Sequence, residues 1–225
     1  MLQEGFIGAF LLATVSCLWA ANRTLDLYEA EVGRPLVVFF VLTALWALSN
    51  LVLILPVPAS VMHTSYIFGL FVGITTVAAW LWFCSVYACT PHHRNRRLQT
   101  LTIGGIVLIV TTKLTNPLHG LYFTPRVASY PFRHFAPETG VIYWAVTGIA
   151  YIGAAIGMYL LFNIYSSSKF NTTKLTALTV LIGLPVVPKV LAVLWPNSLL
   201  FLYYEPLGAA VFGIGIVTAA KDSFL

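Results

Sequence analysis

The stretch Lys113-Leu-Thr-Asn-Pro-Leu-His-Gly-Leu-Tyr-Phe123 decides how this chain is organised. It ends a long apolar run at Asn116 and Pro117, because proline cannot continue a helix. It then places His119 and two aromatic residues where a membrane surface is expected. This is the richest cluster of polar and aromatic side chains in a very apolar sequence. We therefore expect any sensing to take place near it.

The composition is that of an integral membrane protein. Of the 225 residues, 59% are hydrophobic and only 8% are charged, whereas soluble domains carry about 25% charged residues. The mean hydropathy is +0.88. No charged, periodic stretch is long enough to fold as a soluble domain, so we expect residues 1–225 to form a single membrane domain. Glu4 stands where a signal peptide carries positive charge, which indicates an uncleaved first span.

Several classes of function are disfavoured by the residues present. The only basic run is His92–Arg97, so nucleic acid is not an expected partner. Cys17, Cys84 and Cys89 lie in or beside apolar segments, without the spacing of a disulfide framework or a metal site. No nucleophile, base or carboxylate pair forms a catalytic set. We therefore expect a chain that is not an enzyme and has no catalytic residue, cofactor or metal.

Seven apolar segments are each close to the roughly 20 residues that cross a bilayer as a helix. They run too long and too continuously for the strands of a barrel, so the predicted fold is an all-α bundle of seven transmembrane helices. The segments cover about residues 5–21, 35–55, 62–88, 99–115, 140–165, 175–195 and 198–220.

Lysine and arginine in the loops set the expected orientation, since cytoplasmic loops are enriched in both. An outside N-terminus and a cytoplasmic C-terminus leave only Arg126 and Arg133 in outer loops. Lys113 and Lys189 fall within or at the edge of spans. The inner side then receives Arg23, Arg34, Arg94, Arg96, Arg97, Lys169, Lys174 and Lys221.

Two ionisable residues inside spans require an explanation, because charge in hydrocarbon is costly. At about 1.5 Å per residue, Lys189 and Glu205 lie roughly 9 and 10 Å from the outer ends of consecutive antiparallel spans. We predict an ion pair between them. The alternative for Lys189 is that its amine extends to the outer headgroups.

Other polar and aromatic residues fall at a similar depth and are predicted to line one outward-facing cavity for a small amphipathic or aromatic ligand. The alternative is that they are separate interfacial anchors and helix contacts. The long loop of residues 118–139 is expected to cover the cavity as a lid or to lie in the interface. The candidate ligand-binding residues are Asn50, His63, Asn116, His119, Tyr143, Trp144, Lys189, Tyr204 and Glu205.

Small residues four positions apart mark sites where helix backbones can approach closely. Gly69 and Gly73 form one such pair, and Gly153 and Gly157 form another. We expect packing within one chain at these pairs, and the alternative is the interface of a homodimer.

Four features carry a resemblance to a known family: Trp46, Thr115-Asn-Pro-Leu-His-Gly120, Tyr143-Trp144 and Glu205-Pro-Leu-Gly208. Along nearly its whole length the chain resembles the seven-helix sensor region at the N-terminus of many prokaryotic histidine kinases. The resemblance implies a receptor module in the cell membrane that relays a signal to a cytoplasmic partner such as a histidine kinase. Since the chain ends at Leu225, we expect either a stand-alone receptor or the sensor part of a longer protein.

The expected function is therefore that of a membrane sensor, which detects a small molecule or the state of the bilayer in an outer-leaflet cavity. A small-solute transporter or channel is the alternative, with Lys189 and Glu205 as a coupling pair. A third reading is a membrane scaffold whose polar layer is purely structural.

Overall fold

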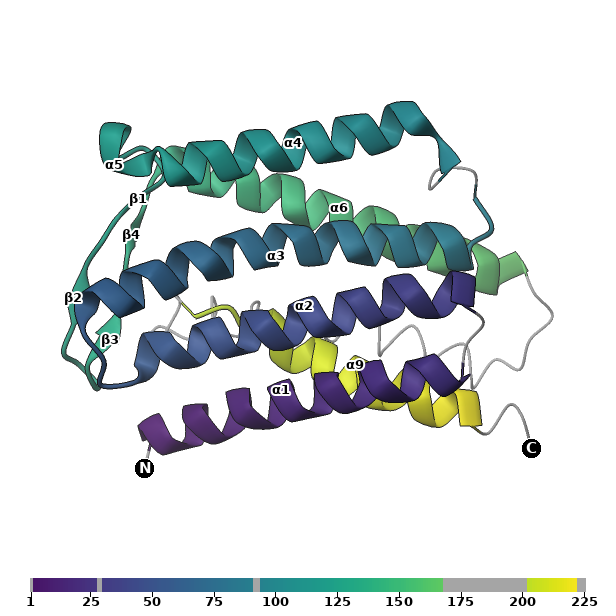
Figure 1. Cartoon of the computed structure of the whole chain (residues 1–225), viewed down its shortest axis with the longest axis horizontal. Coiled ribbons are helices and arrows are strands. Elements are labelled where there is room, and N and C mark those ends of the chain that lie inside the picture. Colours follow the sequence, from purple (N-terminus) through teal and green to yellow (C-terminus); the bar gives the residue numbers. More distant parts are fainter. Residues whose placement is uncertain (1, 28–29, 91–93, 168–201, 222–225) are drawn as a thin grey trace.

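The computed structural model describes residues 2–27, 30–90, 94–167 and 202–221. Five of its helices are long and apolar enough to cross a membrane (Figure 1). They correspond to the first five predicted spans, each with its ends shifted by a few residues. The sixth predicted span, 175–195, lies outside the described residues. The five helices are α1 (Leu2–Leu27), α2 (Ala30–Ile54), α3 (Ala59–Tyr87), α4 (Arg96–Leu114) and α6 (Val141–Ser167).

The helix within the seventh predicted span begins later than the sequence suggested. Helix α9 covers Glu205–Lys221, and residues 202–204 before it are not helical. Pro206 favours this start, because proline is tolerated in the first turn of a helix but not in its interior. The prediction that Glu205 lies roughly 10 Å inside the seventh helix is therefore wrong: Glu205 is the first residue of α9.

The helices alternate in direction, so the two ends of the molecule differ in content (Figure 1). One end, which we call the loop end, holds the N-terminus and the connection from α4 to α6. The opposite end, which we call the tail end, holds the C-terminal ends of α1, α3 and α9 and the starts of α2 and α4. Arg126 and Arg133 lie at the loop end. At the tail end are Arg23, Arg34, Arg94, Arg96 and Arg97.

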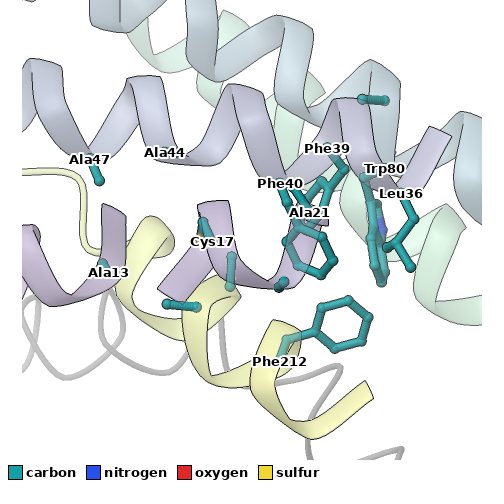
Figure 2. Close-up of a cluster of buried hydrophobic side chains, with 14 of the residues drawn as sticks. Ala13, Cys17, Ala21, Leu36, Phe39, Phe40, Ala44, Ala47, Trp80 and Phe212 are labelled. Carbon is teal, nitrogen blue, oxygen red and sulfur yellow. The ribbon is translucent and has the colours of Figure 1, made fainter. Parts of the chain in front are cut away.

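A core of buried aromatic and small residues joins α1, α2, α3 and α9 (Figure 2). The rings of Phe39 and Trp80 lie 5.5 Å apart, and each meets Phe212 of α9 edge to face, at 6.2 and 5.5 Å. Phe40 packs beside them, 5.3 Å from Phe39. Edge-to-face contacts of this kind fix the relative positions of the helices that carry them.

The predicted small-residue pairs lie at helix contacts within the chain. A Cβ added at Gly73 would lie 3.0 Å from the Trp46 indole, so α2 and α3 approach closely there. A Cβ at Gly157 would collide with Trp80 of α3, so the lack of a side chain at Gly157 allows α6 to pack closely on α3. Trp80 Nε1 also donates to Ala154 O at 3.3 Å. These glycines therefore serve packing within one chain.

The connection from α4 to α6 folds onto the loop end of the bundle. It consists of α5 (Asn116–His119) and four short strands, β1 (Phe123–Thr124), β2 (Val127–Ala128), β3 (His134–Phe135) and β4 (Glu138–Thr139). Strand β1 pairs with β4, and β2 pairs with β3, both antiparallel. Phe123 and Phe135 are buried against Tyr66 of α3, with ring centroids 4.9 and 5.3 Å away. The connection is therefore packed on the ends of the helices.

Asn116 fixes the start of this connection. Its Nδ2 donates to Phe123 O at 2.7 Å, and its Oδ1 accepts from Tyr122 N at 2.9 Å and from Phe123 N at 3.2 Å. Gly120, which ends α5, has a φ of +64°, a left-handed conformation that glycine adopts without steric cost. Together they turn the chain back so that Tyr122 and Phe123 point into the bundle.

Candidate ligand cavity

A cavity of about 150 Å³ lies between α2, α3, α4, α6 and the start of α9. Its walls are mostly apolar, with a few polar groups, which is the usual character of a small-molecule site. Lys113 and Glu205 are the ionisable residues other than tyrosine that line it within the described part of the chain. The aromatic residues that line it are Phe39, Trp46, Trp80, Tyr122, Tyr143, Tyr151 and Tyr203.

Glu205 has one of its two carboxylate oxygens engaged. Oε1 accepts a hydrogen bond from the Tyr151 hydroxyl at 2.8 Å. Oε2 is buried and has no hydrogen-bond partner among the described residues, and the same is true of Trp46 Nε1. Buried polar groups are nearly always hydrogen-bonded. The cavity therefore presents one open acceptor and one open donor.

Tyr203 is held in the cavity wall by Asn50 and by aromatic contacts. Its backbone N–H donates to Asn50 Oδ1 at 3.2 Å, while Asn50 Nδ2 donates to Trp46 O at 3.0 Å. The Tyr203 ring lies 5.5 Å from Trp46 and 6.5 Å from Tyr66, stacked on the latter. Asn50 thus positions the residues just before Glu205 without lining the cavity itself.

Lys113 lines the cavity from α4. It is 3% exposed and is the one buried residue of that helix. Its Nζ donates to Leu70 O at 2.6 Å and lies 5.5 Å from the centroid of the Tyr122 ring. A backbone carbonyl and an aromatic face together partly compensate an amine for lost hydration. The sequence carried a signal for this residue, since Lys113 is the only ionisable side chain within the apolar run of α4.

Two of the nine predicted ligand-binding residues, Tyr143 and Glu205, line the cavity. A third, Asn50, is buried directly behind it and is hydrogen-bonded to two of its walls. Lys189 lies outside the described residues, so its pairing with Glu205 remains a prediction.

The other five predicted residues lie elsewhere. The side chain of Asn116 is hydrogen-bonded to the backbone of Tyr122 and Phe123. His63 packs on Phe123, with ring centroids 5.6 Å apart. His119 and Trp144 are exposed. Tyr204 is buried against Phe6 of α1, with ring centroids 6.3 Å apart, and does not line the cavity.

Sequence reasoning left Tyr151 out of the site, although a pattern could have revealed it. Tyr143, Thr147 and Tyr151 all line the cavity. They are spaced four residues apart, so they share one face of α6. A polar stripe at helical spacing in an otherwise apolar helix marks the face that turns to other helices. The same helical spacing does not distinguish Tyr203 from its neighbour Tyr204, because both residues precede the start of α9.

Among the described residues, no group of three histidine, cysteine, aspartate or glutamate side chains could hold a metal ion. The cavity itself combines apolar walls, aromatic faces, a carboxylate and an indole N–H.

The long apolar helices indicate a multi-pass α-helical membrane protein, and the family comparison agrees with this class. The chain belongs to the family described as the N-terminal 7TM region of histidine kinase, whose model matches residues 6–220. This family is a membrane sensor region of two-component signalling and not a kinase core. It is the family to which the sequence resemblance pointed. No curated protein matches the chain.

Proposed function

We propose that residues 1–225 form a single sensor domain of seven transmembrane helices, with the N-terminus outside and the C-terminus in the cytoplasm. In this proposal the cavity binds a small molecule near the outer leaflet, and the bundle relays occupancy to a cytoplasmic partner such as a histidine kinase. The observation that carries the proposal is the cavity itself, which has a buried carboxylate oxygen and an indole N–H without partners among the described residues. Membership of the sensor family supports it.

The aromatic core offers a physical route for the relay. Phe39 and Trp80 line the cavity, and both also contact Phe212 of α9. A ligand that displaces either ring therefore changes the packing of α9, which runs on to the tail end. A ligand shifts the equilibrium between two packings of the bundle only if it binds one packing more tightly than the other. The relay thus requires two packings of Phe39, Trp80 and Phe212.

A matched pair of variants in α6 tests whether the cavity is the sensing site. Ala150→Leu adds bulk to the cavity lining, whereas Ala145→Leu adds the same bulk to an exposed position one turn earlier. The purified protein in detergent is screened by thermal shift against metabolites, lipids and quinones. A cavity ligand raises the midpoint of thermal unfolding of the natural chain and of Ala145→Leu, but not that of Ala150→Leu. Equal shifts in both variants would rule out this cavity.

The relay is tested by hydrogen exchange with the same ligand. We expect altered exchange in α9 as well as around the cavity, and a Phe212→Leu variant should still bind but lose the change in α9. If exchange changes only at the cavity walls, the ligand is bound but no signal passes through α9. Ligand-dependent solute flux in reconstituted vesicles would instead support the transporter alternative.

A further inference from the structure

We propose that the cavity takes a small organic amine in its protonated form, with the ammonium group on Glu205 Oε2 and a compact apolar body between α3 and α6. This inference rests on the proposed function, because it names the class of ligand for the same cavity. Four features of the cavity lead to it.

The first feature is the open oxygen of Glu205. Glu205 is the first residue of α9, so its side chain lies at the positive end of the helix dipole. The Tyr151 hydroxyl occupies Oε1, and Oε2 has no partner among the described residues. A buried carboxylate oxygen without a donor is costly, and an ammonium N–H is the donor that compensates it best.

The second feature is the aromatic surface next to this carboxylate. Tyr151 is hydrogen-bonded to Glu205, and Tyr203 precedes Glu205 by two residues. The Trp46 ring lies 5.5 Å from the Tyr203 ring. Organic cations bind to the faces of such rings, and tryptophan provides the strongest attraction. A metal ion or a strongly hydrated cation would gain less from these walls.

The third feature is the amine already present. The Lys113 amine lines the same cavity and is bound to Leu70 O and the Tyr122 ring. It therefore already occupies the carbonyl oxygen and the aromatic face that a second ammonium group on the ligand would need. The cavity therefore selects a monoamine over a diamine.

The fourth feature is size and polarity. The apolar lining includes Ile74, Val77, Val146, Ala150 and Ala154. An apolar cavity of about 150 Å³ holds a molecule the size of benzene. The ligand body is therefore about that large and apolar, and the polar part is limited to one head group.

Three probes of nearly equal shape test the inference with the full chain in lipid nanodiscs: 2-phenylethylamine, 2-phenylethanol and propylbenzene. They differ in one terminal group, which is an ammonium, a hydroxyl or a methyl group. Calorimetric titration should give an affinity for the amine at least about tenfold higher than for the alcohol, as expected for a charge-assisted hydrogen bond. Glu205→Gln should remove that advantage and change the affinity for propylbenzene less than about threefold.

The control variants identify the site of binding. Ala150→Leu should abolish binding of all three probes, and Ala145→Leu should leave it unchanged, which separates cavity binding from partition into lipid. If Glu205→Gln does not fold, the selectivity of the natural chain among the three probes decides the question.

Each contrary result has a distinct meaning. Equal affinity for the three probes, lost in Ala150→Leu, would overturn the amine inference and leave the cavity as a ligand site. If none of the three probes binds, the result overturns both the amine inference and the proposal that the cavity binds ligands of this size. Tight amine binding only after Lys189→Met would assign the cation on Glu205 to Lys189 and overturn the inference for the natural chain.

Discussion

At the scale of single residues, Asn116 shows how a polar side chain in the characteristic Asn-Pro-Leu-His stretch acts on structure. Its amide makes three hydrogen bonds to the backbone of Tyr122 and Phe123, and its side chain is 4% exposed. It therefore places Tyr122 in the cavity wall while remaining outside the cavity. His119, three residues further on, is exposed; its Nδ1 accepts from Leu121 N at 3.0 Å, and its Nε2 lies 3.4 Å from Thr115 Oγ1.

We expect Asn116→Ala to destabilise the loop end by about 2 kcal/mol, because it leaves buried backbone groups without partners. The midpoint of thermal unfolding should fall, and protease cleavage within residues 118–139 should become faster. His119→Ala is the matched control in the same turn and should change the stability by less than about 0.5 kcal/mol. Equal effects of both changes would show that Asn116 has no special role.

His134 makes the stability of the connection depend on pH. It is 3% exposed on β3, and its Nδ1–H donates to Phe132 O at 2.6 Å. Burial lowers the pKa of His134 below its usual value, and the hydrogen bond to Phe132 opposes this in part. The neutral ring is thus favoured in the folded state.

Because the folded-state pKa of His134 is lower than that of the unfolded chain, its contribution is present above the unfolded value of about 6.5. It is lost as the pH falls through that value towards the folded pKa. We expect thermal stability to decline between about pH 7 and pH 5, with a smaller decline in His134→Gln. An unchanged pH profile in that variant would assign the decline to other groups.

At the scale of elements, α6 is attached to α3 through glycine contacts. Gly157 lies against Trp80 and Cys84, whereas Gly148 on the same helix has open space where a Cβ would be. The two glycines therefore differ in packing but share the same helical backbone. This difference allows packing to be separated from helix propensity.

Gly157→Ala should destabilise the protein by about 1–3 kcal/mol, because the added methyl group forces Trp80 to move. Gly148→Ala should be neutral or stabilise by up to about 1 kcal/mol, since alanine favours the helix more than glycine does. Thermal unfolding and the fluorescence of the tryptophans provide the two measurements. A loss of stability in Gly148→Ala as large as that in Gly157→Ala would mean that the Trp80 contact is not the cause.

At the scale of the whole molecule, the distribution of arginine distinguishes the two ends. Five arginines lie at the tail end and two at the loop end within the described residues. Arg126 at the loop end is also paired with Glu138, with Nη1 and Oε1 2.7 Å apart. The bias favours a cytoplasmic tail end by the positive-inside rule.

Cysteine labelling of intact cells tests this orientation. Cys89 at the tail end is the exposed cysteine among the three, since Cys17 and Cys84 are buried. The natural chain should resist a membrane-impermeant maleimide until the cells are permeabilised. Tyr130→Cys at the loop end, where the natural side chain is 89% exposed, should react at once. The reverse pattern would invert the proposed topology and move the cavity to the cytoplasmic half.

The sequence by itself determined the five long apolar helices of the described residues, because the length and apolarity of a segment decide whether it can cross a bilayer as a helix. It also identified Glu205, since a charge in an apolar segment requires a reason, and Tyr143 through its place at the start of α6. Only the tertiary structure decided which side chains meet. A membrane helix is apolar on all faces, so hydropathy does not fix its rotation. The polar stripe of α6 and the single lysine in the apolar run of α4 were signals for Tyr151 and Lys113, but only the structure shows that both line the same cavity. It also shows Tyr203 in the place expected of its neighbour Tyr204.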